Sequence, residues 1–123
     1  MKICITSEGK TLDSNVDSRF GRCKNFIFFD TDTGNFEAQE NSSSQFQGGA
    51  GIHSGQFVAS KDAKAVLTGN IGPNAHQVLS AAGINVFVGV SGTVKETIEN
   101  YKQGKYKLAE VPSVGSKFGM PGK

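Results

Sequence analysis

The sequence predicts a small α/β protein in which helices pack on a mixed five-stranded sheet. Two observations lead to this prediction. In the second half of the chain, short apolar runs alternate with helix-like segments, and such strand–helix–strand units require parallel pairing with right-handed crossovers. In the first half, two strand-like runs flank a turn, and this hairpin pattern requires antiparallel pairing. The expected order of elements is β-β-β-α-β-α-β-α.

The length and composition indicate one globular domain. A chain of 123 residues fits a single domain, and 37% hydrophobic with 20% charged residues allows a core and excludes wholesale disorder. We expect a single domain over residues 1–108. The remaining residues, 109–123, are basic and contain glycine and proline, so we expect a loosely ordered tail.

The charge and hydropathy exclude two classes of protein. A net charge of +2 is too small to indicate nucleic-acid binding. No apolar run approaches the ~20 residues of a membrane span, and the N-terminus lacks a signal-peptide pattern. We therefore expect a cytoplasmic protein that binds neither nucleic acid nor a membrane. Two cysteines do not form a disulfide framework, and Cys4, between Ile3 and Ile5, is expected in the core.

The first three strands are expected over residues 2–6, 25–30 and 36–40. The second of these, Asn-Phe-Ile-Phe-Phe-Asp, is almost continuously apolar, which predicts a strand covered on both faces. The polar residues between the first two strands have the composition of a loop, and residues 31–35 form a turn. The connection over 41–51 is rich in Ser, Gln and Gly. It exceeds the ~4–6 residues typical of compact domains, which indicates a mobile or functional loop.

The second half of the chain gives clearer signals. A proline suits the first position of a helix, and a glycine suits the left-handed residue that ends one. Thr93 with Glu96 forms a capping box at the start of the last helix. The expected elements are helix 51–62, strand 65–67, a helix from Pro73 to Gly83, strand 86–88, and a helix from Thr93 to Gly104.

A cysteine flanked by cations is the first candidate for chemistry. Arg19, Arg22 and Lys24 surround Cys23, and positive charge favours an ionised thiol, which is a soft metal ligand. The same cations would attract an anionic cluster, and Gly21 would let the backbone approach it. The alternative is a surface turn with an incidental cysteine, which composition alone favours.

A glycine-rich segment before the predicted helix 51–62 is the second candidate. Gly49 and Gly51 would leave backbone N–H groups free to bind an anion, although the segment lacks the Lys-Ser/Thr pair of a nucleotide-binding loop. His53, in the first turn, is a candidate metal ligand. A surface histidine is the commoner outcome at such a position.

The third candidate is the turn Gly69-Asn70-Ile71-Gly72, which follows a predicted parallel strand and leads into a helix. Open α/β sheets bind ligands at this position, while a tight turn without a ligand would need the same residue types. We expect His76, in the helix that follows, to be exposed, with metal ligation as the minority alternative.

Together these motifs resemble the dinitrogenase iron–molybdenum cofactor biosynthesis family. The resemblance covers roughly residues 1–105, and it is carried by motifs that occur in the order of the family. They are Met-Lys-Ile-Cys-Ile-Thr-Ser at the start, Ser-Arg-Phe-Gly-Arg-Cys at 18–23, Gly-Ala-Gly-Ile at 49–52, Gly-x-x-Gly-Pro-Asn-Ala at 69–75, and Ala-Gly-Ile-x-Val at 82–86.

The resemblance implies a three-layer α/β domain with a ribonuclease H-like motif, in agreement with the order of elements above. It also implies a stand-alone member that handles a metal cluster. The residues that we expect to bind the cofactor are Arg19, Phe20, Gly21, Arg22, Gly49, Gly51, Gly72 and Asn74. Many relatives carry His, a favoured cluster ligand, where this chain has Arg19, so the metal-ligand candidates are Cys23, His53 and His76.

Three functions follow as hypotheses. The first is a non-enzymatic carrier that binds an anionic Fe–S or Mo-containing cluster and passes it between donor and acceptor proteins, as a monomer or weak dimer. The second is a metal-free module that binds a small molecule or a protein. The third, a Mg²⁺-dependent nuclease, is disfavoured because such enzymes need clustered carboxylates and residues 1–7 contain no Asp or Glu.

Overall fold

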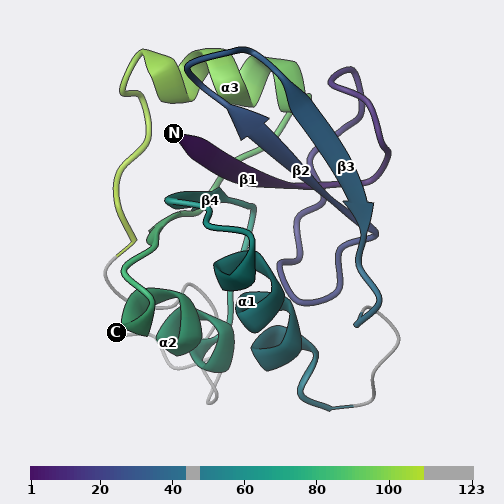
Figure 1. Ribbon diagram of the computed structural model, residues 1–123, viewed down its shortest axis with the longest axis vertical. Helices are drawn as coiled ribbons and strands as arrows, with labels where there is room; N and C mark the ends of the chain where they lie inside the picture. The colour runs from purple at the N-terminus through teal and green to yellow at the C-terminus, as the bar shows by residue number, and fades with distance from the viewer. Residues whose placement is uncertain (44–47, 110–123) are drawn as a thin grey trace.

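A computed structural model describes residues 1–43 and 48–109 (Figure 1). Residues 44–47 of the predicted 41–51 connection lie outside the described residues, and so do residues 110–123 of the predicted tail. Within the described residues, no helix combines the length and the apolar character needed to cross a membrane.

In the described part of the chain, five strands form one mixed sheet in the order β3-β2-β1-β4-β5. The strands are β1 (Lys2–Ser7), β2 (Asn25–Asp30), β3 (Phe36–Glu40), β4 (Ala65–Leu67) and β5 (Asn85–Phe87). The β1–β2 and β2–β3 pairs are antiparallel, whereas β1–β4 and β4–β5 are parallel. The predicted combination of an N-terminal hairpin and C-terminal parallel units is therefore confirmed, with the last strand one residue earlier than expected.

Among residues 1–43 and 48–109, three helices cover the two faces of the sheet. They are α1 (Ala50–Ser60), α2 (Pro73–Ala81) and α3 (Val94–Lys102). Figure 1 shows α1 and α2 on one side of the sheet and α3 on the other, so the domain has three layers. The predicted order of elements and the three-layer α/β architecture are confirmed, and the first helix ends two residues earlier than the predicted 62.

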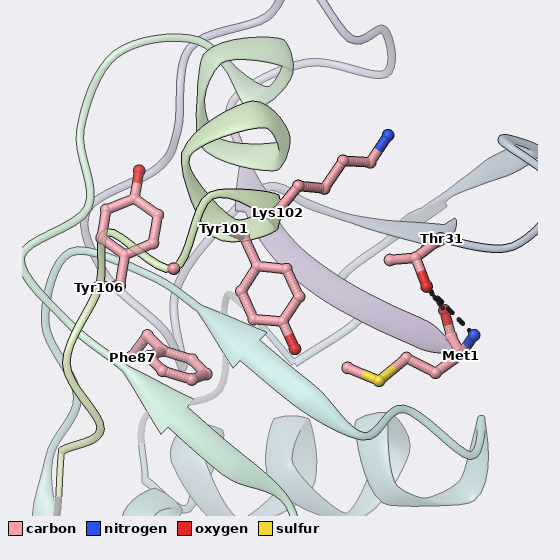
Figure 2. A pocket seen from close by; sticks show the side chains of 7 residues that line it. Met1, Thr31, Phe87, Tyr101, Lys102 and Tyr106 are labelled. Atoms are coloured by element: carbon pink, nitrogen blue, oxygen red, sulfur yellow. Dashed lines mark hydrogen bonds between the residues drawn. The ribbon is translucent and has the colours of Figure 1, made fainter.

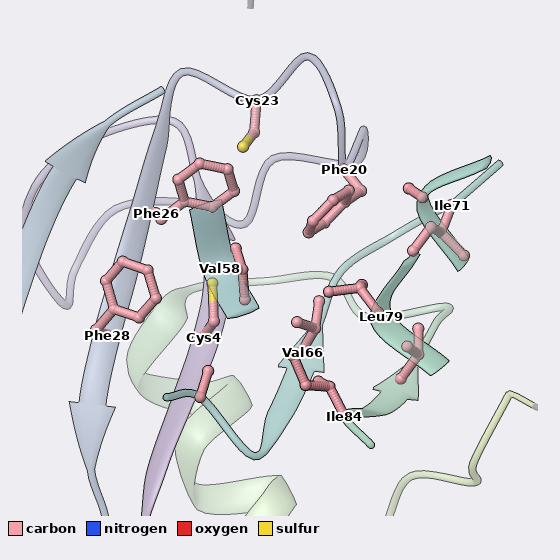
Figure 3. Packing of buried hydrophobic residues seen from close by; sticks show 13 residues of the cluster. Cys4, Phe20, Cys23, Phe26, Phe28, Val58, Val66, Ile71, Leu79 and Ile84 are labelled. Atoms are coloured by element: carbon pink, nitrogen blue, oxygen red, sulfur yellow. The ribbon is translucent and has the colours of Figure 1, made fainter. Parts of the chain in front are cut away.

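The side chains of β1 alternate between two hydrophobic clusters. Ile3 and Ile5 point into the cluster beneath α3, and Cys4 points into the cluster beneath α1 and α2. Phe26 and Phe28 of β2 join Cys4, as Figure 3 shows. Because both faces of β1 and β2 are covered, consecutive residues in the middle of each strand are apolar, Ile3 to Ile5 and Phe26 to Phe29. The predictions of a core cysteine at Cys4 and of a doubly covered second strand are confirmed.

The topology brings the beginnings of α1 and α2 to one edge of the sheet. The carboxyl ends of parallel β1, β4 and β5 lie at the same edge, and α2 starts there because it follows β4. The helix α1 leads into the amino end of β4, so its own N-terminus also lies at the carboxyl edge. Both helices thus start where open α/β sheets bind their ligands.

Two glycines let α1 and α2 approach closely. Gly51 and Gly55 are one turn apart and share a face of α1. A Cβ atom on Gly51 would lie 3.3 Å from the Ala75 Cβ, and one on Gly55 would lie 3.0 Å from Val78 Cγ1. Larger residues at these two positions would push the helices apart.

The capping box at the start of α3 is present as predicted. The Glu96 N–H donates to Thr93 Oγ1 at 3.1 Å, and the Thr93 N–H donates to Glu96 Oε1 at 3.0 Å. Thr93→Ala is expected to lower the free energy of unfolding by about 1 kcal/mol, measured by urea denaturation. Thr93→Ser keeps the capping oxygen and should retain most of the stability, and an equal loss in both variants would contradict the capping account.

Candidate anion site at the carboxyl edge of the sheet

The turn that contains Ser18 and Arg19 is fastened to the loop that follows β4. The Asn70 N–H donates to the Ser18 carbonyl at 2.7 Å, and the Phe20 N–H donates to the Asn70 carbonyl at 3.1 Å. A Cβ atom on Gly69 would lie only 2.7 Å from Ser18 Cα. Glycine is required at position 69 because the two backbones touch.

The same turn lies against the first turn of α1. A Cβ atom on Gly21 would lie 2.9 Å from both the N and the Cα atoms of Gly51. Since Gly51 in turn contacts Ala75, the turn 17–24 and the first turns of α1 and α2 meet at one place. Three segments that are distant in sequence therefore form one surface.

Asp17 organises this turn from inside. Its side chain is buried, with Oδ1 accepting from the Arg19 N–H and Oδ2 from the Lys24 N–H, each at 3.2 Å. The Arg19 Nε lies 3.5 Å from Asp17 Oδ1, and the rest of the Arg19 side chain remains largely exposed. One buried carboxylate thus fixes both ends of the 19–24 segment and one of its cations.

Both helix N-termini at the site lack side-chain caps. Gly49 precedes α1 in the left-handed conformation (φ 75°), Gly72 precedes α2 in an extended one, and neither has a side chain to accept a hydrogen bond. The first intrahelical bonds are donated by the N–H groups of His53 and His76. The N–H groups without a partner among the described residues are those of Ala50, Gly51, Ile52, Asn74 and Ala75.

The electrostatics of this surface favour an anion. Each helix N-terminus carries the equivalent of roughly half a positive charge. The side chains of Arg19, Arg22 and Lys24 are exposed on the adjoining turn, and their positive charge exceeds the one negative charge of Asp17, which pairs with Arg19. Paired N-termini with free N–H groups and neighbouring cations can hold negative charge without any ionised side chain as a ligand.

Most of the predicted cofactor-binding residues converge on this surface. Gly49 and Gly72 are the N-caps, Gly51 and Asn74 lie in the first turns, and Gly21 packs on Gly51. Arg19 and Arg22 lie on the adjoining turn, at its solvent side.

Phe20 differs from its predicted role in cofactor contact. Its ring is 2% exposed and packs against Phe26, with 5.9 Å between ring centroids. Because the Phe20 ring is buried in the core, it cannot contact a cofactor bound at the surface. Phe20 instead anchors the turn, because its ring is held in the core while its N–H is bonded to the β4–α2 loop.

The prediction of an accessible thiolate at Cys23 is wrong. The side chain is fully buried in the cluster beneath α1 and α2, where Figure 3 shows it near Phe26 and Phe20. Burial and the nearby Asp17 carboxylate raise the pKa of the Cys23 thiol far above its usual range, and Arg19 offsets this only in part. The cations flank Cys23 in sequence, but their side chains face solvent while the sulfur faces the core.

Both buried thiols should make the protein less stable in alkali. Burial raises the pKa of Cys4 and Cys23, so both remain protonated in the fold when the unfolded chain ionises above about pH 8.5. Stability is therefore complete below that pH and should fall above it, by up to about 1.4 kcal/mol per pH unit for each thiol. Urea denaturation across this range measures the slope, and a Cys4→Ala, Cys23→Ala variant should show a shallower one.

The two histidines occupy different environments. His53 is exposed in the first turn of α1, and its ring lies beside Gly49, where a Cβ atom would be 3.5 Å from Cδ2. His76 was expected to be exposed, but it is 8% exposed and its Nε2 lies 2.9 Å from the Ala109 carbonyl. His76 thus fastens residue 109 to α2, while His53 remains a predicted ligand. No group of three His, Cys, Asp or Glu side chains suited to a metal occurs in the described part of the chain.

Sequence reasoning missed two buried polar residues behind the site. Asn41 and Ser54 bind the carbonyl of Gly21 from the interior, at 3.1 and 3.2 Å. Asn41 lies in a segment with the composition of a loop, and Ser54 looks like an ordinary polar helix residue, so neither carries a sequence signal. Gly55, in contrast, could have been found from the sequence, because its spacing of four residues from Gly51 is typical of close helix packing.

A separate hollow lies on the opposite, α3 side of the sheet. It has a volume of about 440 Å³, and Figure 2 shows the rings of Tyr106, Tyr101 and Phe87 grouped together with Met1 opposite them. The nearby Lys102 ammonium lies 5.5 Å from the Phe29 ring centroid. None of the predicted site residues lines this hollow, so it is distinct from the anion site.

Comparison with known proteins identifies the family. A profile described as dinitrogenase iron-molybdenum cofactor matches residues 1–104. The chain belongs to this family. The family predicted from the sequence motifs is therefore confirmed, and the match includes every segment that forms the candidate site.

Two solved structures and one further protein sequence are similar to this chain. The apo form of the orange protein from Desulfovibrio gigas superposes with a TM-score of 0.89 and 38% identity, over 91% of this chain and 95% of that one. A putative NifB protein from Thermotoga has a TM-score of 0.77 and 36% identity, over 87% and 91% of the two chains. An uncharacterised protein of Methanocaldococcus jannaschii is 28% identical over 114 residues, which is 89% of this chain and 97% of that protein.

Proposed function

We propose that this protein is a non-enzymatic carrier that binds an anionic Fe–S or Mo-containing cluster as cargo and releases it to an acceptor protein. The observation that carries the proposal is the pairing of two uncapped helix N-termini beside the Arg19–Lys24 turn. Membership of the iron–molybdenum cofactor family supports a metal cluster as the anion.

The chemistry of the site suits a cargo that must leave again. The cluster would accept hydrogen bonds from the free N–H groups of α1 and α2 through its outer sulfur or oxygen atoms, with Arg19 and Arg22 balancing its charge. The buried Cys23 sulfur supplies no ligand in this conformation. A cluster held mainly by hydrogen bonds and charge can be passed on without breaking a metal–thiolate bond. The imidazole of His53, beside Gly49, lies close enough to the site to assist in binding the cluster.

Gly72→Asp tests whether the free N–H groups bind the cargo. The backbone at Gly72 (φ −87°, ψ 175°) suits an N-cap, and a Cβ atom there would have no neighbour within 4 Å. The aspartate would accept hydrogen bonds from the first turn of α2 and add a negative charge. We expect unchanged or higher thermal stability and about tenfold weaker cluster retention, since one charge at ~6 Å in a partly wet site costs ~1.4 kcal/mol.

The experiment uses anaerobic reconstitution with iron, sulfide and molybdate, followed by metal analysis and absorbance. Gly72→Ala is the matched control and should retain the cluster, while Gly72→Ser caps the helix without charge and should be intermediate. Equal retention by the aspartate and alanine variants would exclude this site. If the wild-type protein retains no metal but binds inorganic phosphate, the metal-free module replaces the carrier.

A further inference from the structure

Asn41 is the centre of a buried polar network behind the anion site. It is 6% exposed, and its Nδ2 donates to the carbonyls of Gly21 at 3.1 Å and Cys23 at 3.0 Å. Its Oδ1 accepts from the Ser43 N–H at 3.0 Å and lies 3.3 Å from Ser54 Oγ, whose single proton is shared between this oxygen and the Gly21 carbonyl. The amide group therefore uses its whole hydrogen-bonding capacity.

This network connects three segments, two of which are also joined by the Asn41 N–H, which donates to the Lys24 carbonyl at 2.9 Å. Asn41 follows β3, Gly21 and Cys23 belong to the turn 17–24, and Ser54 lies in α1, where it is fully buried. Ser54 is three residues after Gly51, so it lies on the turn of α1 directly behind the contact between Gly21 and Gly51. The two side chains together hold the turn on the first turn of α1.

The network also binds two carbonyl oxygens that would repel an anion if they faced it. A carbonyl oxygen carries partial negative charge, and one facing the cargo would oppose binding. The Gly21 oxygen is instead bound by both Asn41 and the buried Ser54 hydroxyl, and the Cys23 oxygen is bound by Asn41. Both oxygens are therefore turned into the protein and away from the surface where the cations lie.

We propose that Asn41 is a positioning residue for the anion site, which it serves by drawing the Gly21 and Cys23 carbonyl oxygens inward and keeping the turn 17–24 against α1. The inference rests on the proposed function. It assigns Asn41 no contact with the cargo, because its amide is occupied inside the protein.

Asn41→Asp tests the inference with nearly the same side-chain shape. The variant keeps an oxygen for the Ser43 N–H and the Ser54 hydroxyl, but it places a second oxygen against two carbonyl oxygens. We expect the turn to move away from α1 and the affinity for tetrathiomolybdate, a diamagnetic sulfido anion, to fall about tenfold, as for other residues that orient a site from behind. Titration followed by absorbance gives the affinity.

Amide NMR separates positioning from general destabilisation. In the wild-type protein, added tetrathiomolybdate should shift the amide signals of Gly21, Gly51 and Ala75 together. In Asn41→Asp the Gly21 shift should be lost, while those of Gly51 and Ala75 should persist at higher anion concentration. Thr93→Ala, on the opposite face of the sheet, is the control and should lower stability while leaving the affinity as in the wild type.

Several outcomes would overturn the inference. One is an Asn41→Asp protein that binds the anion as tightly as the wild type, and another is a Thr93→Ala protein that loses as much affinity as Asn41→Asp. If Asn41→Asp does not fold, Ser54→Ala serves as the second variant, because it removes one donor to the Gly21 carbonyl. It should weaken anion binding with the same loss of the Gly21 shift. Unchanged binding by Ser54→Ala would count against the inference. If the wild-type protein itself binds no anion, the proposed function fails first and the inference fails with it.

Discussion

Gly69→Ala is expected to destabilise the protein by about 3 kcal/mol, because the added Cβ would collide with a neighbouring backbone. The added Cβ would lie 2.7 Å from Ser18 Cα and 2.8 Å from the Ser18 carbonyl oxygen, both backbone atoms. Ser18 cannot retreat, because its carbonyl is held by the Asn70 N–H at 2.7 Å. The substitution must break that bond or separate the turn from the β4–α2 loop. Urea denaturation measures the loss.

Gly72→Ala is the matched control, three residues away in the same loop. A Cβ atom at Gly72 would have no neighbour within 4 Å, and its φ of −87° is allowed for alanine. This variant should remain within about 0.5 kcal/mol of the wild type. A Gly69→Ala protein as stable as Gly72→Ala would show that the contact with Ser18 is looser than described.

Asp17→Asn is expected to give the second large effect, a loss of about 2–3 kcal/mol together with weaker cluster retention. Both carboxylate oxygens accept a backbone N–H, from Arg19 and from Lys24, and the Arg19 guanidinium lies beside one of them. The amide nitrogen of asparagine can replace neither acceptor, so one buried N–H loses its partner. The loss of charge also releases Arg19.

Asp13→Asn provides the comparison for Asp17→Asn. Asp13 is exposed on the same loop, so the same chemical change should alter stability by no more than about 0.5 kcal/mol. Urea denaturation and metal analysis of the reconstituted proteins check both variants. A similar small effect at the two positions would mean that Asp17 does not organise the turn.

The fold could be predicted from the sequence because the residues that mark each helix and strand lie within or beside that element. The capping box at Thr93, Pro73 at the start of α2 and the aromatic run of β2 each reflect a constraint within a few residues. The boundaries shifted by one or two residues where helix and strand ends depend on tertiary contacts, as at α1 and β5.

Only part of the candidate site could be predicted from the sequence, because the environment of some of its residues depends on contacts between distant segments. Glycines mark close backbone approach, so Gly21, Gly51 and Gly72 were found from composition and motif. The environment of Cys23 depends on rings and helices brought from elsewhere in the chain, such as Phe26 and Val58. The cations beside Cys23 in the sequence therefore suggested an ionised thiol, whereas burial of the side chain raises the pKa of this thiol and keeps it protonated.

The contacts of Gly51 with Ala75 and of Gly55 with Val78 also bear on selectivity. At these contacts the main chain of α1 packs directly on the short side chains of Ala75 and Val78, so the two helix axes are held close together at a nearly fixed distance. The two rows of N–H groups are then a rigid receptor whose span is fixed before any guest arrives. We expect such a receptor to discriminate among guests of equal charge by their radius.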